Sequence, residues 1–154
     1  MRAVRATRTF AAAMAEAERC WYDTSRWPSW VDGLDHVVQT AAPWPRVGGG
    51  VTWQSGPAGR GRVTEQVVAY APARGQSLEV SDDAVTGRQT VAFIQVPDGV
   101  EVTLEFEYRL HRRSPVSPVV DLLFIRRQMT ESLLRTLERF GMRLRDEPRP
   151  AALP

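Results

Sequence analysis

Residues 117–145 carry the longest helical pattern in this chain, and that pattern restricts the fold more than any other feature. Ser117 is a favourable N-cap, and Pro118 suits the first helical position. At roughly 1.5 Å per residue, the predicted helix is about 40 Å long. One apolar stripe with a period of 3.6 follows its length, formed by Leu122, Met129, Leu133, Leu137, Phe140 and Leu144. A helix this long predicts that the rest of the chain packs along the stripe.

The preceding part of the chain, from residue 35 to 111, has the pattern of strands and turns. Candidate strands are 35–42, 50–55, 61–71, 76–82, 87–96 and 100–111, separated by turn sequences rich in glycine and proline. The clearest strand is 100–110, where apolar side chains alternate with polar ones and indicate one buried face. Residues 2–9 predict a first strand, residues 11–22 a helix, and Pro28 the first residue of a brief second helix.

The dipeptide Asp98-Gly99 is the strongest hairpin signal in the chain. A turn at these two residues pairs Pro97 with Val100 and thereby fixes the register of the flanking strands. The facing pairs expected on the inner side are Val102 with Gln95, Leu104 with Phe93, Phe106 with Val91, and Tyr108 with Gln89. This register also places two polar groups, Gln89 and Tyr108, on the inner side.

Composition indicates one ordinary globular domain. The chain has 154 residues, of which 43% are hydrophobic and 25% charged. We expect the domain to span 1–146 and the proline-rich residues 147–154 to be a disordered tail. No apolar run approaches the roughly 18 residues of a membrane helix, and charges interrupt the N-terminal segment where a signal peptide needs an apolar core. With Cys20 as the one cysteine, these features predict a cytoplasmic protein without a disulfide.

The charged residues give no sign of nucleic acid or metal as a partner. All 20 basic side chains are arginine, but they are scattered among 18 carboxylates, which predicts a solvated surface of mixed charge. His36 and His111 lack the spacing of metal ligands, and the nucleophile and phosphate-loop motifs are absent. We therefore predict no cofactor, no metal and no nucleic-acid partner. A monomer and a homodimer are both compatible with the sequence.

Several segments resemble one protein superfamily. Residues 21–23 (WYD) and 26–30 (RWPSW) are similar to the segment that carries two short helices in the START-related helix-grip (SRPBCC) superfamily, polyketide cyclase/dehydrase-like branch. Residues 61–72 (GRVTEQVVAYAP) look like a strand and turn of that branch, and the strand from Gly87 to Phe93 and the final helix also fit. The resemblance covers residues 3–145. It implies an α+β helix-grip fold, with a curved antiparallel sheet around the C-terminal helix and two short helices after the first strand.

The resemblance also implies an apolar cavity between sheet and helix. Members of the superfamily bind lipids, polyketides or isoprenoids, and some catalyse cyclisation or dehydration. We expect ligand contacts from the inner strands, the segment at the cavity mouth and the helix, at Trp30, Trp53, Gln89, Val91, Phe93, Leu104, Phe106, Tyr108, Arg126, Met129 and Leu133. The tryptophans can equally be core residues, since large aromatic side chains usually are. No catalytic residue is assigned, although an enzyme on this scaffold would use Tyr108 with an inward arginine or carboxylate.

Arg126 is the sharpest of these expectations. On a helical wheel it falls inside the apolar stripe, four residues after Leu122 and three before Met129. A buried guanidinium needs a partner, and Glu65 and Asp82 on the strands are the candidates. Arg126 then either fixes a ligand carbonyl or phenolate, or packs its stem at the edge of the helix and keeps its charge in water.

Three functions remain open from the sequence. The first is a carrier that binds an apolar small molecule, of the lipid, polyketide or isoprenoid type. The second is a cyclase or dehydratase of polyketide-like substrates, which needs several convergent polar groups in the cavity. The third is a module that docks on another protein and whose cavity is vestigial, filled by large apolar side chains. The number of polar groups that face the cavity distinguishes the three.

Overall fold

The computed structural model describes residues 2–111 and 118–146, and of residues 118–122 it describes the backbone alone. The elements run in the order β1 (Arg2–Phe10), α1 (Met14–Tyr22), a 3₁₀ turn η1 (Thr24–Arg26), α2 (Trp27–Trp30), β2 (Leu34–Ala41), β3 (Gly50–Ser55), β4 (Arg62–Ala71), β5 (Gly75–Ser81), β6 (Val85–Val96), β7 (Gly99–Leu110) and α3 (Pro118–Asp146). Among these described residues, no helix combines the length and apolar character that a membrane span requires.

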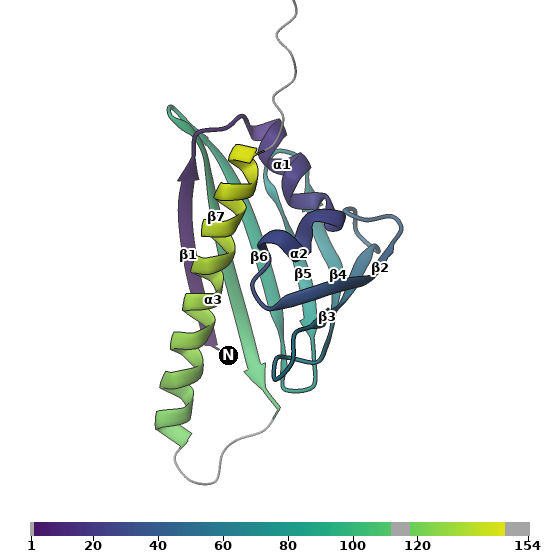
Figure 1. The fold of residues 1–154 in the computed structure, drawn as a ribbon, viewed down its shortest axis with the longest axis vertical. Coiled ribbons are helices and arrows are strands. Elements are labelled where there is room, and N and C mark those ends of the chain that lie inside the picture. Colours follow the sequence, from purple (N-terminus) through teal and green to yellow (C-terminus); the bar gives the residue numbers. More distant parts are fainter. Residues whose placement is uncertain (1, 112–117, 147–154) are drawn as a thin grey trace, which may run out of the picture.

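The strands form one curved antiparallel sheet, and the helices lie on its concave face. The strand order is β1-β7-β6-β5-β4-β3-β2, so the two edge strands are the first two in the chain. In Figure 1, α3 runs along β1 and β7, while α1 and α2 lie in front of the middle strands. The predicted α+β helix-grip architecture is confirmed.

Alternating burial along the strands gives the sheet a wet face and a dry face. In β3 the buried positions are Val51, Trp53 and Ser55, and in β4 they begin with Val63, Glu65 and Val67. The dry face points toward the helices because the hydrophobic core lies between the two layers. Ser55, Glu65 and Gln76 interrupt the apolar pattern of that face, and Glu65 is the ionisable residue among them.

An aromatic cluster fills the space beside the C-terminal half of α3. The ring centroids of Trp21 and Trp30 lie 4.7 Å apart, and Phe140 of α3 lies 4.9 Å from Trp21 and 5.1 Å from Trp30. Phe10, at the end of β1, packs edge-on against Phe140 at 5.4 Å. This cluster joins α1, α2 and α3. It does not fill the space beside the N-terminal half of α3.

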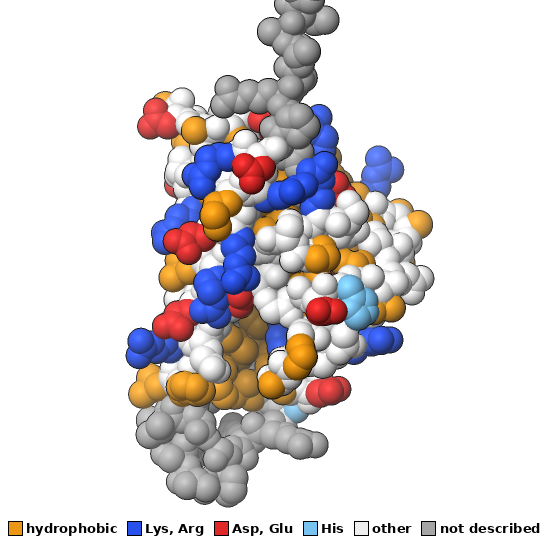
Figure 2. Space-filling view, viewed as in Figure 1, with side chains coloured by type: hydrophobic (Ala, Val, Ile, Leu, Met, Phe, Trp, Pro, Cys, Tyr) orange, Lys and Arg blue, Asp and Glu red, His pale blue; other side chains and the backbone are white. Residues whose placement is uncertain are grey.

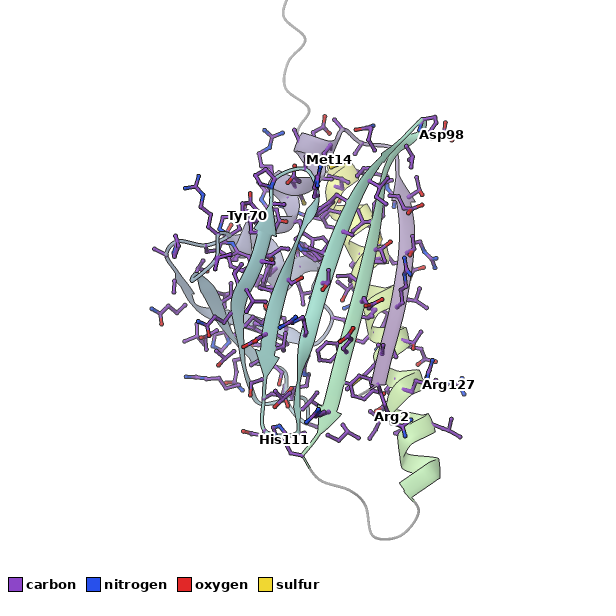
Figure 3. All side chains as sticks on the ribbon, turned by 180° about the vertical axis from the view of Figure 1, so that it is seen from behind. Arg2, Met14, Tyr70, Asp98, His111 and Arg127 are labelled. Atoms are coloured by element: carbon purple, nitrogen blue, oxygen red, sulfur yellow. The ribbon has the colours of Figure 1, made fainter. Side chains whose placement is uncertain are left out.

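The β6–β7 hairpin forms with a register two residues away from the predicted one. Val96 pairs with Gly99, so the turn residues are Pro97 and Asp98, not Asp98 and Gly99. Proline has no N–H to contribute to the ladder, and the turn is therefore its least costly position. Figure 3 shows Asp98 at one end of this hairpin and His111 at the other.

The two-residue shift changes the partners but preserves the faces. Val102 faces Phe93, Leu104 faces Val91, Phe106 faces Gln89 and Tyr108 faces Gly87. Because side chains alternate with a period of two, each predicted inner residue stays on the inner side. Gly99 starts β7 at φ +147°, where a Cβ would lie 1.9 Å from the carbonyl oxygen of Phe10. A glycine at this position therefore allows β1 to approach closely.

The first helix starts later than the sequence predicts, and two further predictions, on the cap of the last helix and on the tail, concern residues that the structure does not describe. The first helix begins at Met14 rather than at residue 11, because β1 continues to Phe10 before the chain turns. Ser117, the predicted cap of the last helix, and the predicted tail 147–154 lie outside the described residues.

Candidate functional site

A cavity of about 600 Å³ lies between the concave face of the sheet and the N-terminal half of α3. Most of its walls are apolar side chains, namely Trp21, Trp27, Trp30, Val31, Trp53, Leu78, Val85, Leu104, Phe106, Ile125, Met129 and Leu133. Figure 2 shows hydrophobic side chains at the base of a hollow beside α3. This volume lies within the range of about 300–1,000 Å³ that is typical of small-molecule sites.

The structure places most of the predicted site residues on this cavity. Those that line it are Trp30, Trp53, Gln89, Leu104, Phe106, Met129 and Leu133. Val91, Phe93 and Tyr108 point to the same side of the sheet but are buried in the core and are not part of the lining. The Tyr108 ring stacks on Phe106 at 5.8 Å, beside it on the same face of β7 and outside the cavity lining.

The inward placement of Arg126 is wrong. Arg126 is exposed, while its neighbour Ile125 and Met129 one turn later line the cavity. The cavity-facing side of α3 thus runs through Ile125, Met129 and Leu133, and it excludes Arg126, whose burial would have required a partner for its charge. The predicted partner Asp82 pairs with Arg60 instead.

Arg60 and Asp82 form an ion pair at the edge of the cavity. Arg60 Nε donates to Asp82 Oδ2 at 2.5 Å, and the other oxygen of this buried carboxylate accepts from the backbone N–H groups of Ala84 and Val85. The Arg60 guanidinium lies 5.8 Å from the ring centroids of both Trp53 and Phe106. These rings belong to β3 and β7, which lie on opposite walls of the curved sheet. The Arg60 side chain therefore reaches across the concave face.

Glu65 lies on the cavity wall and is fully buried. Its Oε2 atom has no hydrogen-bond partner within the described part of the chain. Burial raises the pKa of Glu65 to about 7, although the positive charge of Arg60 and the nearby indole of Trp53 lower it in part. The Trp53 indole N–H lies close enough to the carboxyl to lower this pKa, although the two groups do not meet the distance and angle of a hydrogen bond.

Glu65 was expected from the sequence only as a partner for Arg126, and its place in the site was missed. The sequence carried a signal for this place: in the predicted strand 61–71, Glu65 stands between Val63 and Val67 in the alternating set of residues that faces inward. A carboxyl among apolar inner residues is costly to bury, and such groups are frequent at functional sites.

Two indole N–H groups add to the polar groups of the cavity wall. The Nε1 atoms of Trp30 and Trp53 are buried, and neither has a hydrogen-bond partner among the described residues. In contrast, Trp27 Nε1 donates to the backbone carbonyl of Trp21 at 2.8 Å. An indole nitrogen can only donate. The cavity therefore combines a largely apolar wall with a few free donors and one carboxyl, Glu65, that is outside the ion pairs, which is suited to orienting an otherwise apolar molecule.

The mouth of the cavity is held together by Asp32, between α2 and β2. Its carboxylate accepts hydrogen bonds from Ser132, Arg135 and Arg139 of α3 at 2.7–3.2 Å, and its backbone N–H donates to Thr136 at 3.0 Å. Burial alone would raise the pKa of Asp32, but the hydrogen bonds from Arg135 and Ser132 and the nearby arginine charges hold it below its usual value. Asp32 is therefore a charged tie between the loop and the helix.

The remaining reactive side chains lie away from the cavity. His36 pairs with Asp35 on the exposed side of β2, and His111 bonds to Thr86 at the end of the sheet. Cys20 is buried in α1, and burial raises the pKa of its thiol, which disfavours the thiolate. Within residues 2–111 and 118–146, no three side chains of the metal-binding types are grouped.

Solved structures share this fold. A START superfamily protein from Mycobacterium smegmatis superposes with a TM-score of 0.72 at 14% identity, over 93% of this chain and 97% of that one. A protein from Thermus thermophilus gives a TM-score of 0.71 at 16% identity, with the same two coverages. A protein from Mesorhizobium loti gives 0.70 at 18% identity, over 96% and 100% of the two chains.

Sequence comparison assigns the family. The search of curated protein sequences gave no match. The profile of the family described as polyketide cyclase / dehydrase and lipid transport matches residues 1–145, which include every element of the sheet and nearly all of α3. The chain belongs to this polyketide cyclase / dehydrase and lipid transport family.

Proposed function

We propose that this protein binds one apolar small molecule, of the lipid, polyketide or isoprenoid type, in the cavity between the sheet and α3. The observation that carries the proposal is the cavity itself, with a volume of about 600 Å³ and walls built mainly from tryptophan and aliphatic side chains. Burying apolar ligand surface there is favourable at roughly 25 cal/mol per Å². The protein is proposed to act in the cytoplasm, as a monomer or homodimer, without nucleic acid or membrane insertion.

Most charged groups of the wall are paired with one another: Asp82 with Arg60, Asp32 with Arg135, and Glu131 with Arg127. Glu65 and the two indole N–H groups without a partner among the described residues are left to meet a ligand, a small set that suits a carrier. A vestigial cavity would be filled by large side chains, and the open volume is at odds with that alternative. Glu65 is the observation that favours a second candidate, an enzyme of the cyclase or dehydratase type, because a carboxyl with a pKa of about 7 can both give and accept a proton near neutral pH.

A titration with N-phenyl-1-naphthylamine, a neutral apolar fluorophore, tests the binding function. We expect saturable binding of one probe molecule per folded chain, together with a co-purifying apolar compound in native mass spectrometry. The absence of saturable binding by folded protein would contradict the proposal. Turnover of a polyketide-like substrate that is lost in Glu65→Gln would favour the enzyme over the carrier.

A further inference from the structure

We propose that Glu65 selects the ligand: in its protonated form it donates a hydrogen bond to a carbonyl oxygen at the buried end of an otherwise apolar molecule. The inference rests on the binding function proposed above and adds to it a chemical class, an apolar ketone or quinone-like compound. Its basis is the position of one fully buried, partnerless carboxyl oxygen on the cavity wall.

Strand pairing brings Glu65 and Trp53 to the same part of the wall. Val51 pairs with Glu65 and Trp53 pairs with Val63, so Glu65 and Trp53 are diagonal neighbours on the inner face of β3 and β4. Diagonal neighbours on adjacent strands lie within reach of large side chains. A ligand atom that approaches Glu65 therefore also approaches the free indole N–H of Trp53.

The balance of donors and acceptors identifies the ligand group. The indoles of Trp30 and Trp53 can only donate, and a neutral carboxyl donates through its O–H. A carbonyl oxygen, with two lone pairs and no proton, fits such a set of donors. An ammonium group does not fit, because it has no acceptor to offer the indoles and because the Arg60 guanidinium faces the same cavity.

The other charged groups on the cavity are already paired. Asp82 pairs with Arg60, Asp32 pairs with Arg135 and Arg139, and Glu131 pairs with Arg127 at 3.0 Å. Among the described residues, Glu65 is thus the lining carboxyl without an ion pair. Burial raises its pKa to about 7, so the neutral donor form is well populated at and below neutral pH. A buried carboxylic acid that stays neutral and donates a hydrogen bond is an established arrangement in enzymes.

The test compares two probes that differ in one group. The first is Prodan, an aminonaphthalene with a propionyl side chain, and the second is its analogue in which a methylene replaces the carbonyl. For the wild-type protein we expect the ketone to bind about tenfold more tightly at about pH 5.5, and we expect this preference to fade by about pH 8.5 as Glu65 loses its proton. The quenching of tryptophan emission reports the binding of both probes.

Variants assign the preference to Glu65. In Glu65→Gln the amide still donates, so the preference for the ketone should persist and lose its pH dependence. In Glu65→Leu the preference should fall several-fold, to what the indole donors alone provide, and lose its pH dependence, while the methylene analogue still binds. Glu79→Gln, which removes a carboxylate from the exposed face of the neighbouring strand β5, is the matched control and should behave like wild type. Circular dichroism verifies that each variant is folded.

The possible outcomes are distinct. A ketone preference that is undiminished in Glu65→Leu, or that does not change with pH in the wild type, overturns the role of Glu65 but leaves the binding function intact. Binding of neither probe to the folded wild type overturns the binding function, and this inference with it.

Discussion

Asp32 and Arg135 form a two-pronged ion pair across the mouth of the cavity. Arg135 Nε lies 3.0 Å from Asp32 Oδ1, and Arg135 Nη2 lies 3.1 Å from Asp32 Oδ2. Both residues also line the cavity, one from the loop before β2 and the other from α3. Because planar pairs of this kind fix orientation as well as distance, the contact holds the helix at a defined position over the sheet.

Removal of this contact should loosen α3. Asp32→Ala deletes the acceptor of Ser132, Arg135 and Arg139. We expect the unfolding free energy to fall by about 1–2 kcal/mol, and not by more, because the arginines are partly exposed and solvent weakens their ion pairs. Asp35→Ala is the matched control, since Asp35 and its partner His36 are both largely exposed and their pair should contribute little. Urea denaturation of the three proteins measures the difference, and equal losses in the two variants would contradict this role of Asp32.

Glu65 should make stability depend on pH. Its pKa is about 7 in the folded state and near 4.5 in the unfolded chain, so the folded state binds the proton more tightly. The unfolding free energy of wild type should therefore fall as pH rises from about 4.5 to about 7, by up to about 3 kcal/mol, and then level off. Glu65→Leu should not show this fall, and the difference between the two proteins should grow over that range.

The same urea titrations, repeated at several pH values, provide the measurement for Glu65. Glu79→Gln serves as control, because an exposed carboxylate on the outer face should leave the wild-type pH profile in place. A difference between wild type and Glu65→Leu that stays constant with pH would show that folding does not raise the pKa of Glu65, and would contradict this account.

Tyr108 provides a contrast within the same sheet. Its hydroxyl is buried without a hydrogen-bond partner among the described residues, and the side chain lies beside Phe106, outside the cavity lining. Tyr108→Phe should therefore leave probe affinity unchanged and raise the unfolding free energy by up to about 1 kcal/mol, since it removes a polar atom whose desolvation is unfavourable. A loss of probe binding in this variant would place the Tyr108 hydroxyl in the site.

Local patterns were sufficient to predict the elements of this fold. The period of two from Val100 to Leu110 and the glycine-rich turns located the strands, and most boundaries fall within two residues of the prediction. These signals come from residues close together in the chain and from the alternation of polar and apolar side chains, and both can be read from a sequence. The register of β6 against β7 was predicted wrongly. The missing N–H of Pro97 is a signal in the sequence for a turn at Pro97 and Asp98, whereas the approach of Phe10 to Gly99 joins distant residues and no local pattern shows it.

The site was harder to predict because it depends on how α3 is rotated about its axis. Residues 125 and 126 differ by about 100° on a helix, so a small rotation decides which one faces the cavity. The structure selects Ile125, and Arg126 stays in water. Arg60 comes from a turn, and no periodic pattern could reveal that it crosses the sheet to the rings of Trp53 and Phe106.

Filling the space between the sheet and α3 tests whether the ligand occupies it. Leu133 is buried and lines the cavity, whereas Leu123 on the same helix is 64% exposed and does not. The measurement is the affinity for N-phenyl-1-naphthylamine of folded Leu133→Trp, with Leu123→Trp as the matched control. We expect at least about a tenfold loss of affinity in Leu133→Trp, since the larger ring takes up cavity volume, and wild-type affinity in Leu123→Trp. Wild-type affinity in folded Leu133→Trp would contradict binding in this cavity.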